Sequence, residues 1–481
     1  MISADHLLNF YIDGRWVAPE AGVSRHEIIN PATGEVSGIV AYGTDADVHS
    51  AVHAAARAFP KYAAWPQAQR TELLRSVCAE YERRLHDMAE AITAEMGAPL
   101  ETLSKPLQAQ TGLWHFQTAL EIASNFDFDR LRGTTRILRE PVGVCALITP
   151  WNWPVNQIAC KLAPALAVGC SVVLKPSQNA PYSAALMAEI LHDAGVPAGV
   201  FNMVQGSGAA FGELLASHPQ VDMVSLTGSN AAGASVTKAA ADSVKRVSLE
   251  LGGKSANIIL PTADLQQAVT HGVTTMMHNS GQTCVAPSRM LVPHDKLQEV
   301  EAIAKRVCES LVVGDPLAAD TFMGPIANAR QYKRVVEMIE VGVAEGAYLV
   351  TGGAAKPAGY ERGYFVQPTV FSRVSNQMTI AREEIFGPVL AILPYGTVDE
   401  AIDIANDSPY GLSGYVYGAT ADEAQDIARR LRTGMVHLNG ANVDMAAPWG
   451  GYKQSGNGRE WGAWGFEEFL ETKAVLGAVV V

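Results

Sequence analysis

Cysteine is scarce in this chain of 481 residues, which contains six cysteines and no pair at the CxxC spacing. Sparse cysteines without that spacing argue against a disulfide framework and give no zinc motif, so we expect no metal site. Ordinary core packing is the expectation for most of these thiols. The six are Cys78, Cys145, Cys160, Cys170, Cys284 and Cys308.

Long apolar runs and an excess of positive charge are also missing. No stretch reaches 18 consecutive apolar residues, and residues 1–21 lack the apolar segment of a signal peptide. The formal net charge is -13. An acidic chain is a poor partner for nucleic acid or for an anionic membrane surface. We therefore expect a cytoplasmic protein that binds neither.

The glycine-rich turns lack the standard nucleotide fingerprints. Gly206 and Gly208 are followed by Gly212, which misses the third glycine of the dinucleotide spacing. Gly228 and Gly233 have the P-loop separation, but Ala-Ser follows where that motif needs Lys-Ser or Lys-Thr. A kinase or ATPase is thus disfavoured. Dinucleotide binding and tight strand-to-helix turns both stay open as explanations.

Alternating strand-like and helix-like segments dominate what the sequence does contain. The length predicts two or three domains. Residues 8–45 contain short strand-like pieces, and residues 45–96 and 105–124 have helical periodicity. Between residues 141 and 251, strand-like and helix-like segments then alternate five times. This pattern is typical of an open, parallel, doubly wound sheet. Its strand-like segments are residues 144–148, 171–174, 201–204, 221–226 and 246–250.

The alternation returns between residues 253 and 440. We therefore expect an α/β fold with two doubly wound domains and a small β extension. The first domain would comprise residues 1–122 and 141–252, and the second would comprise residues 253–440. Strands of the second are expected at 256–260, 389–393, 412–417 and 435–439, and helices at about 264–278, 295–311, 328–344, 398–407 and 421–432.

Two segments outside these domains predict an interaction sheet. In residues 127–140 charges alternate with apolar residues around Gly133, which predicts a hairpin with a solvent face. Residues 474–481 are a β-branched run that predicts a C-terminal strand. Residues 123–140 and 467–481 would form a small sheet whose exposed edge needs a partner. We expect a homodimer or homotetramer; the alternative is that both segments pack on their own subunit.

Residues 278–287 form a small, polar, glycine-bearing turn that presents Cys284 after an apolar run. Few bulky residues surround this cysteine in sequence, so a substrate carbon can reach its sulfur. The thiolate is the nucleophilic form, and its reactivity depends on a lowered pKa or a nearby base. Cys284 is therefore a candidate nucleophile, and an ordinary loop cysteine is the alternative.

Two strand-end residues are candidate helpers for such a nucleophile. Asn152 follows a strand in a Pro/Trp-rich turn, where its amide can donate to an oxyanion. Glu250 ends an apolar run before two glycines, a setting that raises a carboxyl pKa and suits a general base. Each also has a structural alternative, a turn-capping amide for Asn152 and an ion pair for Glu250.

Four motifs in this order carry a resemblance. They are Pro150-Trp151-Asn152-Trp153-Pro154, Leu249-Glu250-Leu251-Gly252-Gly253-Lys254, Gly281-Gln282-Thr283-Cys284 and Glu383-Glu384-Ile385-Phe386-Gly387-Pro388. From about Tyr11 to its C-terminus the chain resembles the NAD(P)-dependent aldehyde dehydrogenase superfamily. The resemblance implies a cofactor-binding first domain, a catalytic second domain and an oligomerisation extension.

The resemblance also implies a mechanism. Cys284 attacks the aldehyde, and the Asn152 amide and the backbone N–H of Cys284 hold the oxyanion of the thiohemiacetal. Hydride transfer leaves a thioester, and Glu250 activates the water that releases the acid. Lys161 and Glu460 match positions linked to proton relay near Glu250, with a supporting buried ion pair as the alternative.

For the cofactor, NAD or NADP, the resemblance implies contacts that depart from the standard fingerprint. Many NAD-preferring relatives carry a glutamate where this chain has Gln178, and a carboxylate there repels a 2′-phosphate. Because an amide does not, and Lys175 can attract the phosphate, we expect NADP to be used alongside NAD or instead of it. The matched residues are Ile148, Thr149, Pro150, Trp151, Lys175, Ser177, Gln178, Gly208, Gly212, Gly228, Ser229, Leu251, Glu384 and Phe386.

The residues that match the aldehyde tunnel of relatives include tryptophans but no Arg or Lys, which predicts an apolar or aromatic aldehyde. They are Trp114, Trp153, Gln157, Cys160, Thr283, Val285, Val443 and Trp449. A helical aromatic such as Trp114 has core packing as its alternative.

Other functions stay open. The first alternative is a CoA-acylating aldehyde dehydrogenase, but such relatives commonly lack the base at the Glu250 position. The second is a non-catalytic protein on the same fold, which would be expected to have lost the cysteine, the base or the amide. The third is a cofactor-free cysteine hydrolase, which would leave the glycine turns unexplained.

Overall fold

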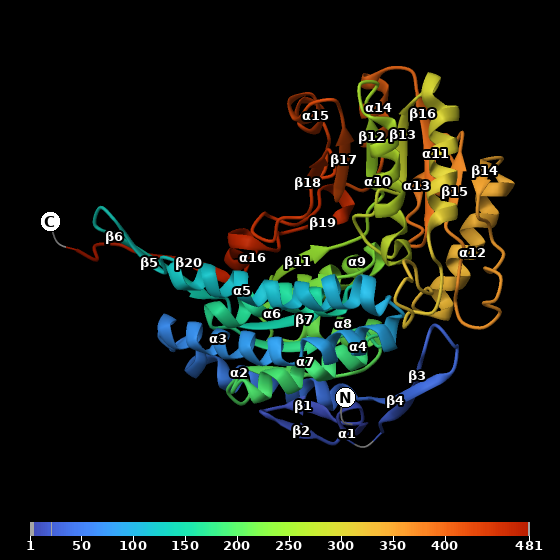
Figure 1. Ribbon diagram of the computed structural model, residues 1–481. Coiled ribbons are helices and arrows are strands. Elements are labelled where there is room, and N and C mark those ends of the chain that lie inside the picture. Colours follow the sequence, from blue (N-terminus) through green and yellow to red (C-terminus); the bar gives the residue numbers. More distant parts are fainter. Residues whose placement is uncertain (1–3, 21, 480–481) are drawn as a thin grey trace.

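The computed structural model describes residues 4–20 and 22–479 (Figure 1). Its strands form two large sheets, of eight and seven strands, and two small sheets, of three and two strands. The predicted α/β fold class is confirmed. Residues 1–3 and 21 of the predicted first domain, and residues 480 and 481 of the predicted extension, lie outside the described residues.

The eight-stranded sheet is parallel at its centre, where β11, β10, β7, β8 and β9 pair in register, and antiparallel at its two edges. The five strands predicted between residues 141 and 251 are its parallel core. In spatial order the strands are β19 (Gly456–Asn457), β11 (Arg246–Glu250), β10 (Met223–Thr227), β7 (Val144–Ile148), β8 (Ser171–Lys175), β9 (Phe201–Met203), β1 (Phe10–Ile12) and β2 (Arg15–Val17).

Helices cover both faces of this sheet, because its central strands are apolar on both sides. Cys145 and Leu147 of β7 enter one buried cluster, and Val144, Ala146 and Ile148 enter another on the opposite face. The helices of this part are α1 (Ala4–Leu7), α2 (Asp45–Ala63), α3 (Gln67–Arg83), α4 (Leu85–Met96), the π-helix η1 (Leu100–Gln108), α5 (Ala109–Asn125), α6 (Pro154–Val168), α7 (Pro181–Asp193), α8 (Gly208–Ser217) and α9 (Asn230–Ala241).

The seven-stranded sheet is parallel except at β14. The four predicted strands are present, but the sequence prediction missed three others. Of these, β13 is a central strand of only five residues enclosed by prolines, and β14 and β15 are short strands near glycine-rich loops. In spatial order the strands are β14 (Tyr348–Thr351), β15 (Thr369–Ser372), β16 (Val389–Tyr395), β13 (Arg289–Pro293), β12 (Ala256–Ile259), β17 (Ser413–Tyr417) and β18 (Met435–Leu438).

The helices that pack on the second sheet match the predicted ones closely, since their apolar residues recur at helical spacing. They are α10 (Leu265–Met277), the short helices η2 (His278–Gly281) and η3 (His294–Lys296), α11 (Leu297–Ser310), α12 (Ala329–Ala344), α13 (Thr379–Arg382), α14 (Val398–Asn406) and α15 (Ala421–Ala428).

A three-stranded sheet of β5 (Asp129–Arg132), β6 (Thr135–Pro141) and β20 (Leu470–Val475) extends away from the two large sheets (Figure 1). The predicted hairpin is present and pairs with a C-terminal strand, Ala474 opposite Ile137. The position predicted for that strand was wrong, because it ends at Val475. Glu471, Thr472 and Lys473 are all exposed and polar, so the sequence has no alternation of apolar and polar residues that would indicate a strand here. A fourth sheet pairs β3 (Ser24–Ile29) with β4 (Val36–Tyr42).

The two large sheets meet at a short connection. Strand β11 ends at Glu250 in the first sheet, and β12 begins at Ala256 in the second, so residues 251–255 join them. The chain then returns to the first sheet near its end. There β19, which follows the short helix η4 (Lys453–Ser455) and precedes α16 (Gly462–Glu468), pairs with β11, Gly456 opposite Glu250.

Candidate active site

Cys284 lies in the loop after α10 and η2. Two residues of the turn, Asn279 and Ser280, have left-handed backbone angles, with φ of 53° and 55°. Gly281 continues the turn with φ of 69°, and a Cβ there would lie 2.2 Å from the carbonyl oxygen of Gly387. Only glycine fits this approach. The tight turn holds Cys284 partly buried at the wall of a cavity between the two large sheets.

Asn152 lies against the same loop. Its turn joins β7 to α6, and the residue is 3% exposed. The amide Nδ2 donates to the carbonyl oxygen of Gln282 over 3.0 Å, and Asn279 Nδ2 donates to the carbonyl oxygen of Asn152 over 2.9 Å. These reciprocal bonds fix the amide beside the cysteine loop, and both Asn152 and Cys284 line one cavity. An amide donor and a nucleophile are thereby brought together.

The Cys284 thiol is not activated by its surroundings. Burial raises its pKa, and the carboxylates of Glu384 and Glu250 raise the pKa further. The thiol is therefore protonated at neutral pH, and it needs a base before it can act as a nucleophile.

Glu250 ends β11 and is buried. Neither of its carboxylate oxygens has a hydrogen-bond partner among the described residues. Burial, and next the charge of Glu460, raise the pKa of this carboxyl well above its usual range, while Lys161 and Arg459 lower it. A buried, unpaired carboxyl group with a raised pKa has the properties of a general base that works near neutral pH.

A polar network lies beside Glu250. Lys161 of α6 is fully buried and forms an ion pair with Glu460, and its Nζ also donates to Thr227 Oγ1 over 2.7 Å. The thiol of Cys160 lies 3.3 Å from the other Glu460 oxygen. Burial by itself would lower the pKa of Lys161, but Glu460, Cys160 and Glu250 together outweigh burial and raise it. Lys161 and Glu460 thus meet as predicted, in the geometry of a buried ion pair next to the candidate base.

A cavity of about 260 Å³ is lined by Cys284, by Asn152 and by many of the predicted cofactor residues. It continues into a larger cleft of about 640 Å³, with which it shares Trp151, Ser229, Gln331 and Arg334. The larger cleft reaches Gln178. The predicted residues on the wall of the smaller cavity are Pro150, Trp151, Asn152, Gln157, Gly228, Ser229, Leu251, Cys284, Glu384 and Phe386.

The far end of the cleft is shaped by residues of β8 and α8. A Cβ at Gly208 would lie 3.8 Å from Gln178 Oε1 and 3.9 Å from Lys175 Nζ, so these polar atoms gather at the start of α8. A Cβ at Gly212, one turn further along α8, would lie 3.8 Å from Cδ1 of Ile148. Burial lowers the pKa of Lys175 to about 8. A cation, an amide and a helix N-terminus at one point suit the phosphate and hydroxyl groups of a nucleotide.

The rest of the predicted cofactor set lies along β7 and α9. Thr149 is buried with its Oγ1 unpartnered among the described residues, and Ser177 Oγ accepts from the backbone N–H of Asn179 over 3.2 Å. Ser229 caps α9, accepting from the N–H of Ala232 over 3.3 Å. The N-terminus of this helix therefore opens onto the cleft beside Gly228, as an anion site requires.

Glu384 and Phe386 face the connection between the sheets. Glu384 Oε1 accepts from the backbone N–H of Gly253 over 3.0 Å, and burial raises the pKa of this carboxyl to about 7. A Cβ at Gly252 would lie 2.3 Å from Glu384 Oε2, so a side chain there would displace the carboxylate. Phe386 packs edge-on against Trp151 at 5.5 Å between ring centroids.

The predicted substrate residues divide into two groups. Cys160, Val285 and Trp449 belong to one buried cluster, against which Cys284 packs. Trp153 Nε1 donates to Thr283 Oγ1 over 3.0 Å, next to the nucleophile. Gln157 lines the cavity itself. By contrast, Trp114 is half-buried on α5 and Val443 is exposed in the loop after β18, and neither belongs to the cavity wall or to the cluster.

Sequence reasoning missed three residues of the site. Trp461 stacks on Trp449 with 4.2 Å between ring centroids and belongs to the same cluster. Gln331 and Arg334 of α12 line both parts of the cleft. Their sequence signal is that of an ordinary amphipathic helix, and the side chains face the cleft only because α12 packs at the junction of the sheets.

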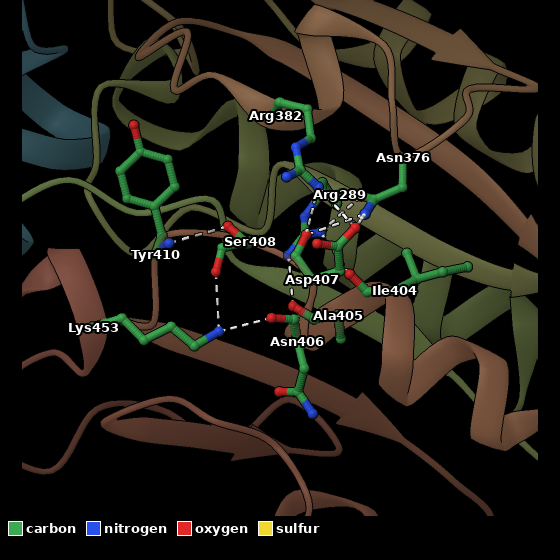
Figure 2. Close-up of polar contacts among 10 residues, drawn as sticks. All are labelled: Arg289, Asn376, Arg382, Ile404, Ala405, Asn406, Asp407, Ser408, Tyr410 and Lys453. Atoms are coloured by element: carbon green, nitrogen blue, oxygen red, sulfur yellow. Dashed lines mark hydrogen bonds and ion pairs between the residues drawn. The ribbon is translucent and has the colours of Figure 1, made fainter.

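A buried arginine holds the segment that follows Cys284. Figure 2 shows Arg289 among backbone and side-chain oxygens, with bonds of 2.9 to 3.1 Å to Ile404, Ala405 and Asn376. Its Nε also donates to the carbonyl oxygen of Lys254 over 3.0 Å. Lys453 binds the carbonyls of Asn406 and Ser408 (Figure 2). Arg289, five residues after Cys284, thereby ties the nucleophile loop to the connection that follows Glu250.

Two negative observations hold for the described part of the chain. No three His, Cys, Asp or Glu side chains are gathered there as metal ligands. None of the helices in residues 4–20 and 22–479 has the length and apolarity needed to cross a membrane.

The fold and the cleft define a class, the nucleotide-dependent dehydrogenases with a doubly wound cofactor domain. Comparison with known proteins gives the family. Residues 16–475 match the model of the aldehyde dehydrogenase family, and the chain belongs to that family. The predicted activity is thereby confirmed: the protein is an NAD(P)-dependent aldehyde dehydrogenase that oxidises an aldehyde to the acid with NAD or NADP as cofactor.

Three relatives illustrate the match. The chain is 60% identical over 468 residues, 97% of its length and 98% of the relative's, to 3-succinoylsemialdehyde-pyridine dehydrogenase of a Pseudomonas species. It superimposes with a TM-score of 0.99 on a mutant of aldehyde dehydrogenase C from Pseudomonas syringae, in complex with NAD+ and octanal, at 49% identity and 100% and 99% coverage. Superposition on betaine aldehyde dehydrogenase of Staphylococcus aureus in complex with NAD+ gives a TM-score of 0.94. The two sequences are 34% identical, and the match covers 98% of this chain and 95% of that one.

Proposed function

We propose that this enzyme oxidises an aldehyde with an apolar or aromatic body, with Cys284 as nucleophile, Asn152 as oxyanion donor and Glu250 as base. One observation carries the proposal. Cys284 and Asn152 line one cavity, Glu250 ends the strand beside it, and the cavity opens into a cleft that fits a dinucleotide.

The first step begins with loss of the thiol proton. Because burial raises the pKa of Cys284, a base must take this proton. The carboxylate of Glu250 lies near enough for its charge to affect the same pKa, and we assign Glu250 as that base. The sulfur then attacks the aldehyde carbon, a C–S bond forms, and the carbonyl oxygen becomes an oxyanion. The Asn152 amide and the N–H of Cys284 stabilise that charge.

Bound NAD(P) would supply the hydride acceptor for the oxidation, which leaves a thioester on Cys284. Residues at three points of the cleft would hold it: Lys175 and Gln178 at the adenosine ribose, Gly228 and Ser229 at the pyrophosphate, and Glu384 with Phe386 at the nicotinamide ribose. Their fit rests on the approach of Lys175 and Gln178 to Gly208 at the start of α8 and on the N-terminus of α9 at Ser229.

Hydrolysis of the thioester needs an activated water. Glu250 takes a proton from that water, and hydroxide adds to the thioester carbon. The C–S bond then breaks, which releases the acid and leaves the thiolate of Cys284 on the enzyme. The Lys161–Glu460 pair beside Glu250 gives the proton a route away from the carboxyl. An unpaired buried base favours hydrolysis over transfer of the acyl group to CoA.

The aldehyde class is supported by the packing around Cys284. Stacked Trp449 and Trp461, with Val285 and Cys160, form a buried apolar cluster against which Cys284 packs, so the nucleophile lies in apolar surroundings that suit an aryl or alkyl group. The relatives carry the same preference in their names. One takes its name from a pyridine-bearing semialdehyde, and another was crystallised with octanal.

The cofactor preference and the assembly belong to the same proposal. Lys175 and Gln178, both near Gly208, support use of NADP beside NAD, because neither repels a 2′-phosphate.

The wholly exposed strand β5, with Leu131 51% exposed, supports a homodimer or homotetramer formed through the extension. The division into a cofactor-binding domain, a catalytic domain and this extension follows the three larger sheets. Six free thiols support the reducing cytoplasm as the compartment.

The test measures initial rates of NADH and NADPH formation with one aromatic and one medium-chain aldehyde. Wild type should oxidise both, and Cys284→Ala should lose the activity while it still binds cofactor. A matched control is Cys308→Ala, a buried cysteine packed in the core of the second sheet. Retained activity in Cys284→Ala, or equal losses in the two variants, would contradict the role of Cys284.

A further inference from the structure

Trp461 has a backbone conformation that residues with side chains rarely adopt. Its φ is 64° and its ψ is 155°, a region almost restricted to glycine. The residue is nevertheless a tryptophan, 7% exposed, at the start of α16. Such strained residues persist only where the surrounding structure holds them, and they cluster at functional sites. The contacts of Trp461 therefore indicate what its strained position serves.

The indole of Trp461 packs against two other rings. It stacks on Trp449 with 4.2 Å between ring centroids and 27° between ring planes, and it meets His115 edge-on at 5.2 Å. Neither tryptophan belongs to the wall of the cavity at Cys284. The influence of Trp461 on the reaction therefore passes through the residues that it holds in place.

Backbone bonds tie the stacked tryptophans to the polar network beside Glu250. Trp449 and Glu460 face each other in an antiparallel bridge, in which each N–H donates to the other's carbonyl oxygen over 2.8 Å. Glu460, the residue before Trp461, carries the carboxylate of the buried ion pair with Lys161. The stack of the two indoles thus clamps the bridge from which Glu460 extends.

The same bridge leads directly to the base. A Cβ at Gly450, the residue after Trp449, would lie 2.9 Å from Glu250 Oε1, so this segment touches the carboxyl group. Burial and the charge of Glu460 raise the pKa of Glu250, whereas Arg459 and the nearby indole of Trp449 oppose that rise. Three groups that act on the base therefore belong to the two segments that the stacked rings join.

We propose that Trp461 is a positioning residue for proton transfer by Glu250. Its stack on Trp449 and its constrained backbone hold the bridged segments so that Gly450 stays against the base and Glu460 stays on Lys161. The proposal rests on the proposed function, because it needs Glu250 as the base.

The experiment combines substitutions at Trp461 and Glu250. Trp461→Ala removes the ring and should lower kcat by about tenfold or more, because a small displacement of a catalytic group is enough for such a loss. In the Glu250→Gln background the same change should lower kcat by less than about twofold, since a residue that acts through the base has no further effect once the base is absent. Trp461→Phe keeps an aromatic ring and should retain kcat within about threefold of wild type.

Two controls accompany these variants. Trp464→Ala removes a tryptophan of the same helix that is 53% exposed, and it should leave kcat as in wild type. The Kd for NADH, measured by its fluorescence, should stay within about threefold in Trp461→Ala, because the cofactor cleft is not lined by this residue.

A comparison of two small residues separates positioning from stability. Glycine adopts the backbone angles of Trp461 freely, whereas alanine retains the strain, so Trp461→Gly should unfold at a higher temperature than Trp461→Ala. Both variants lack the ring, and both should have a kcat at least about tenfold below wild type. A kcat that follows the thermal midpoint across the two variants would overturn the proposal.

The outcomes also separate this proposal from the proposed function. An unchanged kcat in Glu250→Gln would refute Glu250 as the base, and the role of Trp461 with it. A large loss in Glu250→Gln beside wild-type kcat in Trp461→Ala would retain the base and overturn only the role of Trp461. Equal losses from Trp461→Ala with and without the Glu250 carboxylate would show independent effects and overturn that role as well.

Discussion

Replacement of Glu250 by glutamine should separate the two halves of the reaction. The two side chains have the same shape, and an amide oxygen can take the place of the carboxylate oxygen near Trp449, so the change should leave the fold intact. It removes the carboxylate that we assign as the base for water. General base catalysis contributes about 100- to 10,000-fold, so kcat should fall by that factor, about 3 to 5 kcal/mol of barrier.

The pH dependence gives an independent readout of the same residue. The base acts in its deprotonated form, and burial and Glu460 raise the pKa of Glu250. In wild type kcat should therefore increase with pH as this carboxyl ionises and level off above its raised pKa. Glu250→Gln has no group to titrate there, and its kcat should lose this increase.

Rapid-mixing measurements of NADH formation distinguish loss of the base from general damage. If Glu250 acts mainly on the thioester, Glu250→Gln should show a burst of about one NADH per active site followed by slow turnover, because acylation precedes hydrolysis. Addition of a thiol that accepts the acyl group should restore turnover. A variant in which burst and steady rate fall together would place the main role of Glu250 at the thiol proton. Unchanged kcat would refute its role as a base.

Three further predictions follow from single contacts. Gln178→Glu should lower kcat/KM for NADPH formation at least about tenfold relative to NADH formation, because a carboxylate repels the 2′-phosphate; a wild type that prefers NAD more than about 100-fold would refute the premise. Leu131→Glu should shift the oligomer toward monomer in light-scattering chromatography, while Leu317→Glu, also at an exposed leucine, should not. Gly281→Ala should lower the free energy of unfolding by more than about 2 kcal/mol in denaturant titrations and abolish activity, because of its positive φ and the contact with Gly387.

Strands and helices with strong periodicity could be predicted from the sequence, and irregular pieces could not. Strand β7 was predicted at its observed bounds because every residue is apolar and both faces are covered. Strand β13 was missed because Pro287 and Pro293 enclose a short run, and only the neighbouring strands β12 and β16 make it a strand. The C-terminal strand was displaced because its exposed residues are polar and the apolar run after Val475 forms no strand among the described residues.

The candidate site divides in the same way. Cys284, Glu250 and Asn152 are adjacent to local turn signals, so the sequence marks them. Trp461 and Arg334 carry no such signal, because their position depends on the packing of segments far apart in the chain.

The connection at residues 251–255 explains how groups from two sheets can work on one carbon. Glu250 ends the last parallel strand of the first sheet, and only residues 251–255 separate it from the first strand of the second sheet. It is held from both sides: Glu384 accepts from the N–H of Gly253, and Ser455 Oγ donates to the carbonyl oxygen of Gly252 over 2.7 Å. Because Glu384 also faces the cofactor cleft, its backbone bond couples the position of the base to the place where the cofactor lies. The two glycines are therefore required for chemistry as well as for folding, since a side chain at Gly252 would displace the carboxylate that aligns both.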